Sequence, residues 1–366
     1  MRRRLRSIDT FRGICITWMI IGHTMGWWIQ PKDYYTIFFI YINIFVDAFG
    51  SAGFLFISGM SLTLSYKKNL ENLSSYEDYE YKQFRSEYLL RAWLLFLIGF
   101  AYNFIMVLRT FNIKYIYSWF ILQTLPVSMI LFWPFFKSNI FLKILFAITI
   151  LILNEILYLL LIPFQDNFNS IFVVIYYFMY NQVELSPLFR FFPFFIIGSI
   201  IADLIYSKIW SDANYSKKVV LTSFTIPMIL IGFILIFISL CIIPFDILER
   251  FNLSWPVYAI GGHLLIFAIL FSVEFLTSIK IQVKYRFFYY FSYYSFTIFL
   301  LHYPLYFLFT NRLSAILFLP LLLVSIIIIR IFLGLMYRKY GSKFSLKYQL
   351  RIISTELINY FKKTND

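Results

Sequence analysis

Charged residues are scarce in this sequence. Only 14% of its 366 residues are Asp, Glu, Lys or Arg, whereas 61% are hydrophobic and the mean hydropathy is +0.77. Soluble globular domains contain about 25% charged residues, and disordered chains contain few apolar ones. The composition therefore excludes both classes and predicts a protein that crosses a membrane several times.

Residues and motifs that hold disulfides, metals or nucleotides are also rare. The two cysteines, Cys15 and Cys241, both lie in apolar runs, which argues against a disulfide framework or a cysteine metal site. The sequence contains no HExxH, P-loop, GxGxxG or GxSxG motif, and we expect no bound metal. The net charge of +14 lies in short loops and tails, where it sets orientation and attracts anionic lipid. We therefore expect no nucleic-acid partner.

Long apolar runs dominate the rest of the chain. Ten of them are long enough to cross a hydrocarbon core of about 30 Å. They cover 11–29, 50–66, 88–108, 115–136, 140–163, 187–206, 218–243, 256–277, 288–309 and 313–337. Two shorter aromatic-rich segments, 36–49 and 170–182, are interpreted as interfacial or re-entrant helices, with an eleventh span as the alternative. The predicted fold class is an all-α polytopic membrane protein.

Lys and Arg are distributed unevenly between the two sides of these spans. With the N-terminus inside, 23 of the 32 lie on the inner side, six on the outer side and three within spans. Cytoplasmic loops carry the excess of Lys and Arg, so both termini of this cell-membrane protein are predicted to be cytoplasmic. We expect residues 1–337 to form one transmembrane domain and 338–366 to form a basic amphipathic tail on the inner surface.

The first span carries ionisable residues that a plain membrane anchor lacks. Asp9, Arg12 and His23 fall at roughly 0°, 300° and 320° around a helix, so one face presents all three. His23 lies roughly 16 Å from Arg12 along the axis, and one long ligand can reach both. Charges inside a membrane persist mainly when they are paired, hydrated or near an interface. The open alternative is that Asp9 and Arg12 lie among lipid headgroups and only set orientation; the histidine on the same face favours a functional site.

Few other polar residues occur in the spans. His302 lies at a depth comparable to that of the first histidine, so the two are predicted to meet across one cavity, whereas His263 is typical of a structural hydrogen-bond partner. Asp47 precedes a helix rich in Gly and Ser and is a candidate to orient a histidine. Glu274 and Asp203 lie near the inner ends of their spans and are interpreted as solvated acids.

Several motifs resemble those of a known family. RLRSIDTFRGICITWMIIGH is similar to the opening of the heparan-alpha-glucosaminide N-acetyltransferase catalytic-domain family, within the transmembrane acyltransferase superfamily. Later motifs of that family resemble FLFISGMSLTLSY, WFILQTLPVSMIL, RFFPFFIIGSIIA and FSYYSFTIFLLHYPLY, so the similarity runs over most of 4–310. The position of His23 also resembles the end of the first helix in a sister family, acyltransferase family three.

The resemblance implies a membrane acyltransferase that moves an acetyl group from cytosolic acetyl-CoA to an amine or hydroxyl of a sugar or glycan on the other side. Basic residues at the inner end of the first helix can hold the CoA phosphates by charge-assisted hydrogen bonds. A histidine suits the general base because its ordinary pKa of about 6.5 lies near working pH. We expect His23, Asp47 and His302 in catalysis, Asp9, Arg12, Arg6, Gln123 and Ser58 in acetyl-CoA binding, and Arg250 in acceptor binding. Gln123, Ser58 and His302 are also candidate donors to the oxyanion.

Two other functional classes remain as alternatives. A transporter, or a flippase for lipid-linked glycans, also has many helices with buried polar groups, but carriers commonly show inverted repeats, and this sequence shows none. A structural or receptor-like protein would leave the polar stripe on the first helix unexplained. The expected partners are therefore membrane lipids, acetyl-CoA and a sugar or glycan acceptor, with a homodimer left open.

Overall fold

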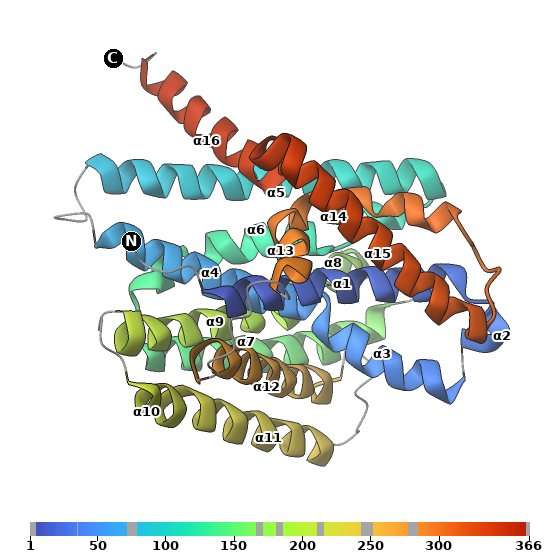
Figure 1. Cartoon of the computed structure of the whole chain (residues 1–366), viewed down its shortest axis with the longest axis horizontal. Helices are drawn as coiled ribbons and strands as arrows, with labels where there is room; N and C mark the ends of the chain where they lie inside the picture. Colours follow the sequence, from blue (N-terminus) through green and yellow to red (C-terminus); the bar gives the residue numbers. More distant parts are fainter. Residues whose placement is uncertain are drawn as a thin grey trace. The chain divides into compact units, whose positions relative to one another are not determined.

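The computed structural model describes residues 5–34, 36–71, 79–165, 171–180, 186–210, 216–242, 252–276 and 285–363. Within these ranges the chain is helical, apart from turns, short connections and one isolated bridge between Ile29 and Leu313. The α-helices (Figure 1) are α1 (Arg6–Trp28), α2 (Pro31–Tyr34), α3 (Ile37–Phe49), α4 (Ser51–Leu70), α5 (Tyr79–Thr110), α6 (Ile121–Phe132), α7 (Ile140–Leu161), α8 (Ile171–Tyr180), α9 (Leu188–Ile205), α10 (Lys217–Val220), α11 (Ile226–Cys241), α12 (Ser254–Leu276), α13 (Tyr285–Tyr293), α14 (Ser295–Leu301), α15 (Ala315–Tyr340) and α16 (Leu346–Lys363). The predicted all-α fold class is confirmed.

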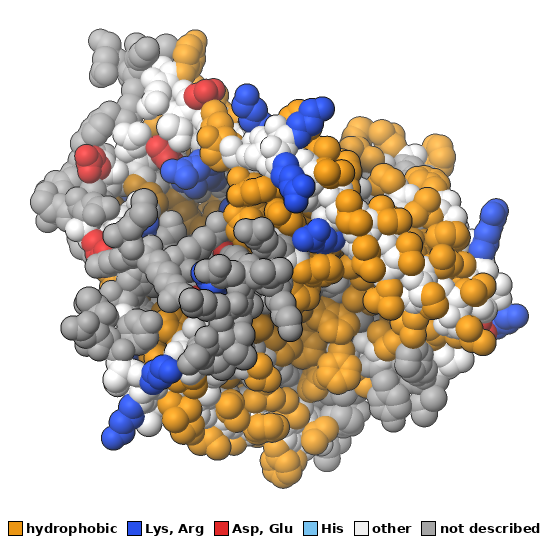
Figure 2. Space-filling model, viewed as in Figure 1, with side chains coloured by type: hydrophobic (Ala, Val, Ile, Leu, Met, Phe, Trp, Pro, Cys, Tyr) orange, Lys and Arg blue, Asp and Glu red, His pale blue; other side chains and the backbone are white. Residues whose placement is uncertain are grey.

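Seven helices among the described residues are long and apolar enough to cross a membrane, and each matches one of the predicted spans. They are Asp47–Leu70, Glu80–Leu108, Ile140–Phe164, Leu188–Ile209, Lys217–Cys241, Ser254–Leu276 and Ala315–Phe361. Hydrophobic side chains cover much of the face seen in Figure 2, and many large apolar side chains are exposed, as contact with lipid requires. The short segments 36–49 and 170–182 contain the helices α3 and α8.

The other three predicted spans are helical but shorter, broken or more polar. The span 11–29 corresponds to α1, which is 23 residues long and carries charged side chains. In 115–136, the extended backbone of Phe120 separates a 3₁₀ turn from α6, which has only 12 residues. In 288–309, Tyr294 separates α13 from α14, and a 3₁₀ helix follows. Hydropathy alone does not detect these breaks.

The chain divides into two compact units, which are described separately. The first comprises Met1–Ile57 and Lys208–Gln349, and the second comprises Ser58–Ser207 and Leu350–Asp366. In the first unit, α1 packs against α13, α12 and α3, and α11 packs along α12 (Figure 1). In the second unit, α7 packs against α9 and α8, and α5 packs against α6. The predicted tail begins within the last turn of α15 and continues as α16.

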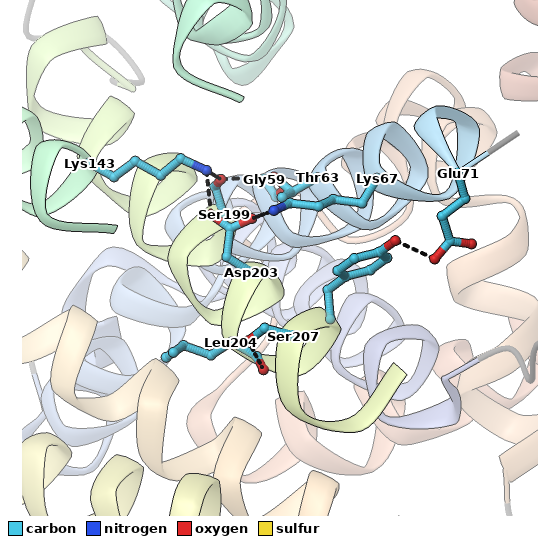
Figure 3. Close-up of polar contacts among 10 residues, drawn as sticks. Gly59, Thr63, Lys67, Glu71, Lys143, Ser199, Asp203, Leu204 and Ser207 are labelled. Atoms are coloured by element: carbon cyan, nitrogen blue, oxygen red, sulfur yellow. Dashed lines mark hydrogen bonds and ion pairs between the residues drawn. The ribbon is translucent and has the colours of Figure 1, made fainter. Parts of the chain in front are cut away.

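A buried ion cluster joins α4, α7 and α9 in the second unit (Figure 3). Asp203 accepts a hydrogen bond from Nζ of Lys143 at 2.5 Å and pairs with Nζ of Lys67 at 3.1 Å. Ser199, one helical turn before Asp203, accepts from Lys143 at 3.1 Å and from the Thr63 hydroxyl at 2.9 Å. Lys143 is fully buried and Asp203 is only 6% exposed. The interpretation of Asp203 as a solvated acid is therefore wrong, because two lysines from other helices enclose it.

In the first unit, α1 and α13 approach closely at Gly13. A Cβ atom at this position would overlap the carbonyl oxygen of Phe288 and would lie 2.8 Å from the Phe288 Cβ. Real Cβ atoms do not approach backbone atoms so closely, so the contact between the two helices requires glycine.

We expect Gly13→Ala to destabilise the protein by about 1–3 kcal/mol, because overpacking forces the backbone of α13 to shift. Gly26→Ala is the matched control on the same helix, since a Cβ at Gly26 meets no atom within 4 Å. Alanine there should stabilise α1 by about 0.5–1 kcal/mol through its helix propensity. Thermal unfolding of the two purified variants in detergent measures the difference, and equal melting temperatures would contradict the close approach.

Candidate active site

The start of α1 is held by a carboxylate from another helix. Glu274, near the end of α12, accepts hydrogen bonds from the backbone N–H groups of Arg6 at 3.0 Å and Ser7 at 2.7 Å. A carboxylate at a helix N-terminus satisfies free N–H groups and interacts favourably with the helix dipole. Glu274 is therefore a helix cap; it is half-buried, and its interpretation as a solvated acid stays a prediction. Arg2, Arg3 and Arg4, which are among the basic residues expected to hold the CoA phosphates, lie outside the described part of the chain.

A buried polar group follows within the first turns of α1. Nη1 of Arg12 lies 3.7 Å from Oδ1 of Asp9 and 3.5 Å from Oγ of Ser292 on α13. The Ser292 hydroxyl donates to Oδ1 of Asp9 at 3.3 Å. Asp9 is 3% exposed and Arg12 is 7% exposed. Both charged side chains therefore face the packed interior of the first unit, as the predicted stripe requires.

Five aromatic rings gather at the other end of α1: His23, Trp27, His302, Tyr303 and Tyr306, called here the histidine–tryptophan cluster. The ring centroids of His23 and His302 are 5.0 Å apart, and Trp27 lies 5.1 Å from the first and 5.7 Å from the second. His23 and Trp27 meet because residues four apart share a helix face. His302 directly follows α14, and the two tyrosines belong to the 3₁₀ helix after it. The structure thus brings together the two histidines that the sequence predicts to meet.

The hydrogen bonds of His302 define its tautomer. Nδ1 lies 2.6 Å from the carbonyl oxygen of Phe299, and a carbonyl oxygen can only accept, so Nδ1 carries the hydrogen. Nε2 is buried and has no hydrogen-bond partner among the described residues. In the neutral ring Nε2 therefore keeps its lone pair. This geometry suits a proton acceptor better than a donor to an oxyanion.

Hydrogen bonds also hold the end of α1 against the segment that follows His302. The indole Nε1 of the fully buried Trp28 donates to the carbonyl oxygen of Leu305 at 2.7 Å. Oδ2 of Asp33, just after α1, accepts from the backbone N–H of Ala315 at 3.0 Å, which caps α15. These bonds hold the end of α1, which carries His23, against the chain segment that follows His302.

Asp47 lies near the end of α3, and a tryptophan contacts its carboxylate. The indole Nε1 of Trp255, a fully buried residue at the start of α12, donates to Oδ2 of Asp47 at 3.0 Å. This bond joins α3 to α12. His263, also on α12, is fully buried, with its ring centroid 5.2 Å from that of Phe49 and 5.6 Å from that of Phe56. A catalytic role for Asp47 stays a prediction.

Gln123 and Ser58 lie in the second unit. Oε1 of Gln123 accepts from the N–H of Phe120 at 3.0 Å, and Nε2 donates to the carbonyl oxygen of Gly99 at 2.6 Å and to Oδ1 of Asn103 at 2.7 Å. The amide therefore joins α5 to α6 and would have to release a bond to serve an oxyanion. Ser58, on α4, is 8% exposed. Donor binding by both residues stays a prediction.

Arg250, the predicted acceptor-binding residue, lies outside the described residues, so its role rests on the sequence alone. Within the described ranges, no group of three or more His, Cys, Asp or Glu side chains is arranged to hold a metal ion. The side chains that the structure brings together around α1 are histidines, an arginine, a carboxylate and a serine. These groups can transfer protons and bind anions.

Comparison with protein families gives a direct match. The family described as Heparan-alpha-glucosaminide N-acetyltransferase, catalytic, matches residues 4–254, which is more than half of the chain. The chain belongs to this family. A comparison with curated proteins gives no match. Because heparan-alpha-glucosaminide N-acetyltransferases are acetyltransferases, the chain is a multi-pass membrane acyltransferase, as its first motif predicts.

The family match includes all of α1 but ends before His302. The sequence did not predict the contacts that three further residues make around α1 in this member of the family. Ser292 interrupts an aromatic run, Glu274 is an acid near a helix end, and Trp27 lies four residues after His23. Because residues four apart share a helix face, the spacing of Trp27 could have predicted its contact with His23. The contacts of Ser292 and Glu274 are recognised only from the tertiary structure.

Proposed function

We propose that this member of the family transfers an acetyl group from cytosolic acetyl-CoA to an amine or hydroxyl of a sugar or glycan on the opposite side of a cell membrane. The observation that carries the proposal is the approach of His23 and His302 to 5.0 Å at one end of α1, the helix that also carries the buried Asp9 and Arg12. The helix rise separates Arg12 from His23 by about 16 Å, so a long donor can lie along α1 with its phosphates at one end and its thioester at the other.

The paired histidines supply the proton transfer in this proposal. The imidazole pair removes a proton from the acceptor amine or hydroxyl, whose nitrogen or oxygen then attacks the thioester carbonyl carbon. The carbon–sulfur bond breaks, and the departing CoA thiolate takes the proton back from the imidazolium to become a thiol. We favour direct transfer without an acyl-histidine, and a general base of this kind contributes about 10²–10⁴-fold to the rate.

Arg12 is the proposed anchor for the donor phosphates. Asp9 and Ser292 lie within 3.7 Å and 3.5 Å of its Nη1, which restricts the orientation of the guanidinium. A guanidinium presents several N–H donors in a planar fork that matches phosphate oxygens. Arg6, half-buried in the first turn of α1, adds positive charge on the same side.

Incubation of the purified protein with radiolabelled acetyl-CoA and a panel of amino sugars and glycans tests the proposal. Covalent label on a sugar supports acetyl transfer. No labelled product with any acceptor, under conditions where the protein is folded, would contradict it. Transport of an unmodified glycan across the membrane of proteoliposomes that contain the protein would instead support the alternative of a carrier.

Arg12→Ala is expected to raise the KM for acetyl-CoA by roughly 10–100-fold with little change in kcat, because a hydrogen bond to a charged group contributes about 1.5–3 kcal/mol. Arg12→Lys keeps the charge but loses the planar fork, so its KM should lie between those of the wild type and Arg12→Ala. Arg85→Ala, at an exposed arginine of α5, is the control. An unchanged KM in Arg12→Ala would leave Arg12 with a role in orientation only.

A further inference from the structure

Trp27 lies at the centre of the histidine–tryptophan cluster. Its indole plane is within 11° of the His302 ring plane and within 23° of the His23 ring plane. Tyr306 meets the indole almost at right angles, at 81° and 5.7 Å between centroids, and Tyr303 lies 5.3 Å away at 45°. Four rings thus contact one half-buried indole, and two of them belong to the proposed catalytic histidines.

This placement differs from that of a tryptophan that only anchors a protein at the membrane interface. Such a ring sits at the level of the lipid headgroups and contacts lipid. Trp93 on α5 is an example of a tryptophan that faces the outside of the protein, because 53% of it is exposed. Trp27, in contrast, stacks on both histidines of the site, and membrane anchoring does not account for this arrangement.

Trp27 is half-buried, and the residue before it on α1 is a glycine. Gly26 is exposed, and a Cβ atom added there would meet no atom within 4 Å. Within the cluster, Nε2 of His302 has no hydrogen-bond partner among the described residues, and the residue is only 4% exposed. A partly exposed aromatic ring with one buried acceptor nearby is a common composition for a small-ligand site.

The chemistry of these groups matches a sugar ring. One face of a pyranose presents several C–H bonds, and the positive ends of such bonds are attracted to the negative face of an aromatic ring. The amine or hydroxyl at the edge of the same sugar can donate a hydrogen bond to a neutral imidazole nitrogen. We infer that the indole of Trp27 is the platform on which the sugar ring of the acceptor stacks, with its reacting group directed to Nε2 of His302. The inference rests on the proposed function and adds to it the residue that selects a sugar as acceptor.

Steady-state acetylation assays on the full-length protein test the inference, with glucosamine, methyl α-glucosaminide and glucose as acceptors and acetyl-CoA as donor. Trp27→Ala should raise the KM for the sugar about tenfold, with the KM for acetyl-CoA unchanged. Trp27→Phe keeps a smaller aromatic face and should give an intermediate KM, and it serves as the second variant if Trp27→Ala does not fold. Trp93→Ala is the matched control and should keep the wild-type KM for both substrates.

Calorimetric titration of the same sugars in the absence of acetyl-CoA separates the inference from the proposed function. Sugar binding that is lost in Trp27→Ala and kept in Trp93→Ala supports the platform, even if the wild-type protein transfers no acetyl group and the proposed function fails. Equal sugar affinity in the wild type and Trp27→Ala overturns the platform and leaves acetyl transfer standing. Absence of sugar binding to the wild type in both assays, or a change confined to the KM for acetyl-CoA, also overturns it.

Discussion

His23→Ala is expected to lower the rate of acetyl transfer by about 10²–10⁴-fold, because the acceptor loses the base that removes its proton. His302→Ala should cause a loss of the same order, since the two rings lie 5.0 Å apart and Nε2 of His302 is a proton acceptor. If the histidines act as a unit, the double variant loses little more than either single variant. Single-turnover transfer from saturating acetyl-CoA measures these effects without contributions from donor binding.

The third histidine provides the matched control. His263 is fully buried among the rings of Phe11, Phe49 and Phe56. His263→Gln, of similar volume, should therefore retain acetyl transfer, with any cost appearing in the melting temperature. A His23→Ala protein that melts like the wild type and remains fully active would remove His23 from the mechanism.

Asp203→Ala is expected to destabilise the protein by about 3–5 kcal/mol, because the fully buried ammonium of Lys143 loses its carboxylate and keeps the neutral Ser199 hydroxyl as acceptor. The expected loss is large because a charge inside a packed, largely apolar helix bundle interacts poorly with its surroundings. Unfolding of the purified protein by heat or denaturant, followed by circular dichroism at constant detergent concentration, measures the change.

Two comparison variants distinguish the buried pair from an ordinary salt bridge. Lys67 pairs with the same carboxylate but its side chain is 30% exposed, so Lys67→Ala should cost no more than about 1 kcal/mol. Replacing both buried partners, Lys143→Met with Asp203→Leu, should restore most of the stability, because no unpaired charge remains. An Asp203→Ala protein as stable as Lys67→Ala would show that the pair does not hold α7 to α9.

The polar stripe of α1 could be predicted because a helix has a regular period. The 3.6-residue repeat alone placed Asp9, Arg12 and His23 on one face, and α1 is a single uninterrupted helix from Arg6 to Trp28. The meeting of His23 with His302 followed from similar depths in two spans. The depth of a residue in a span can be obtained by counting residues from the end of the span, without knowing which helices are neighbours.

The partners of these residues could not be predicted in the same way. Ser292 contacts Arg12 and Asp9 across about 280 residues, and Glu274 reaches the first turn of α1 across a similar interval. Such contacts depend on which helices pack together, and the hydropathy of a helix does not specify its neighbours. The position of Asp203 near the end of its span therefore predicted a solvated acid. In the structure, its carboxylate pairs with two lysines from other helices.

The amino-acid sequence by itself determined the membrane class, seven of the ten predicted spans and the face of α1 that carries ionisable groups, because these depend on composition and on local helical periodicity. The family followed from sequence motifs. Only the tertiary structure decided that Trp27 stacks on the two histidines, that His302 keeps its Nε2 lone pair and that Glu274 caps α1. These features depend on side-chain contacts between helices far apart in the chain, and such contacts follow from close packing rather than from the character of any one segment.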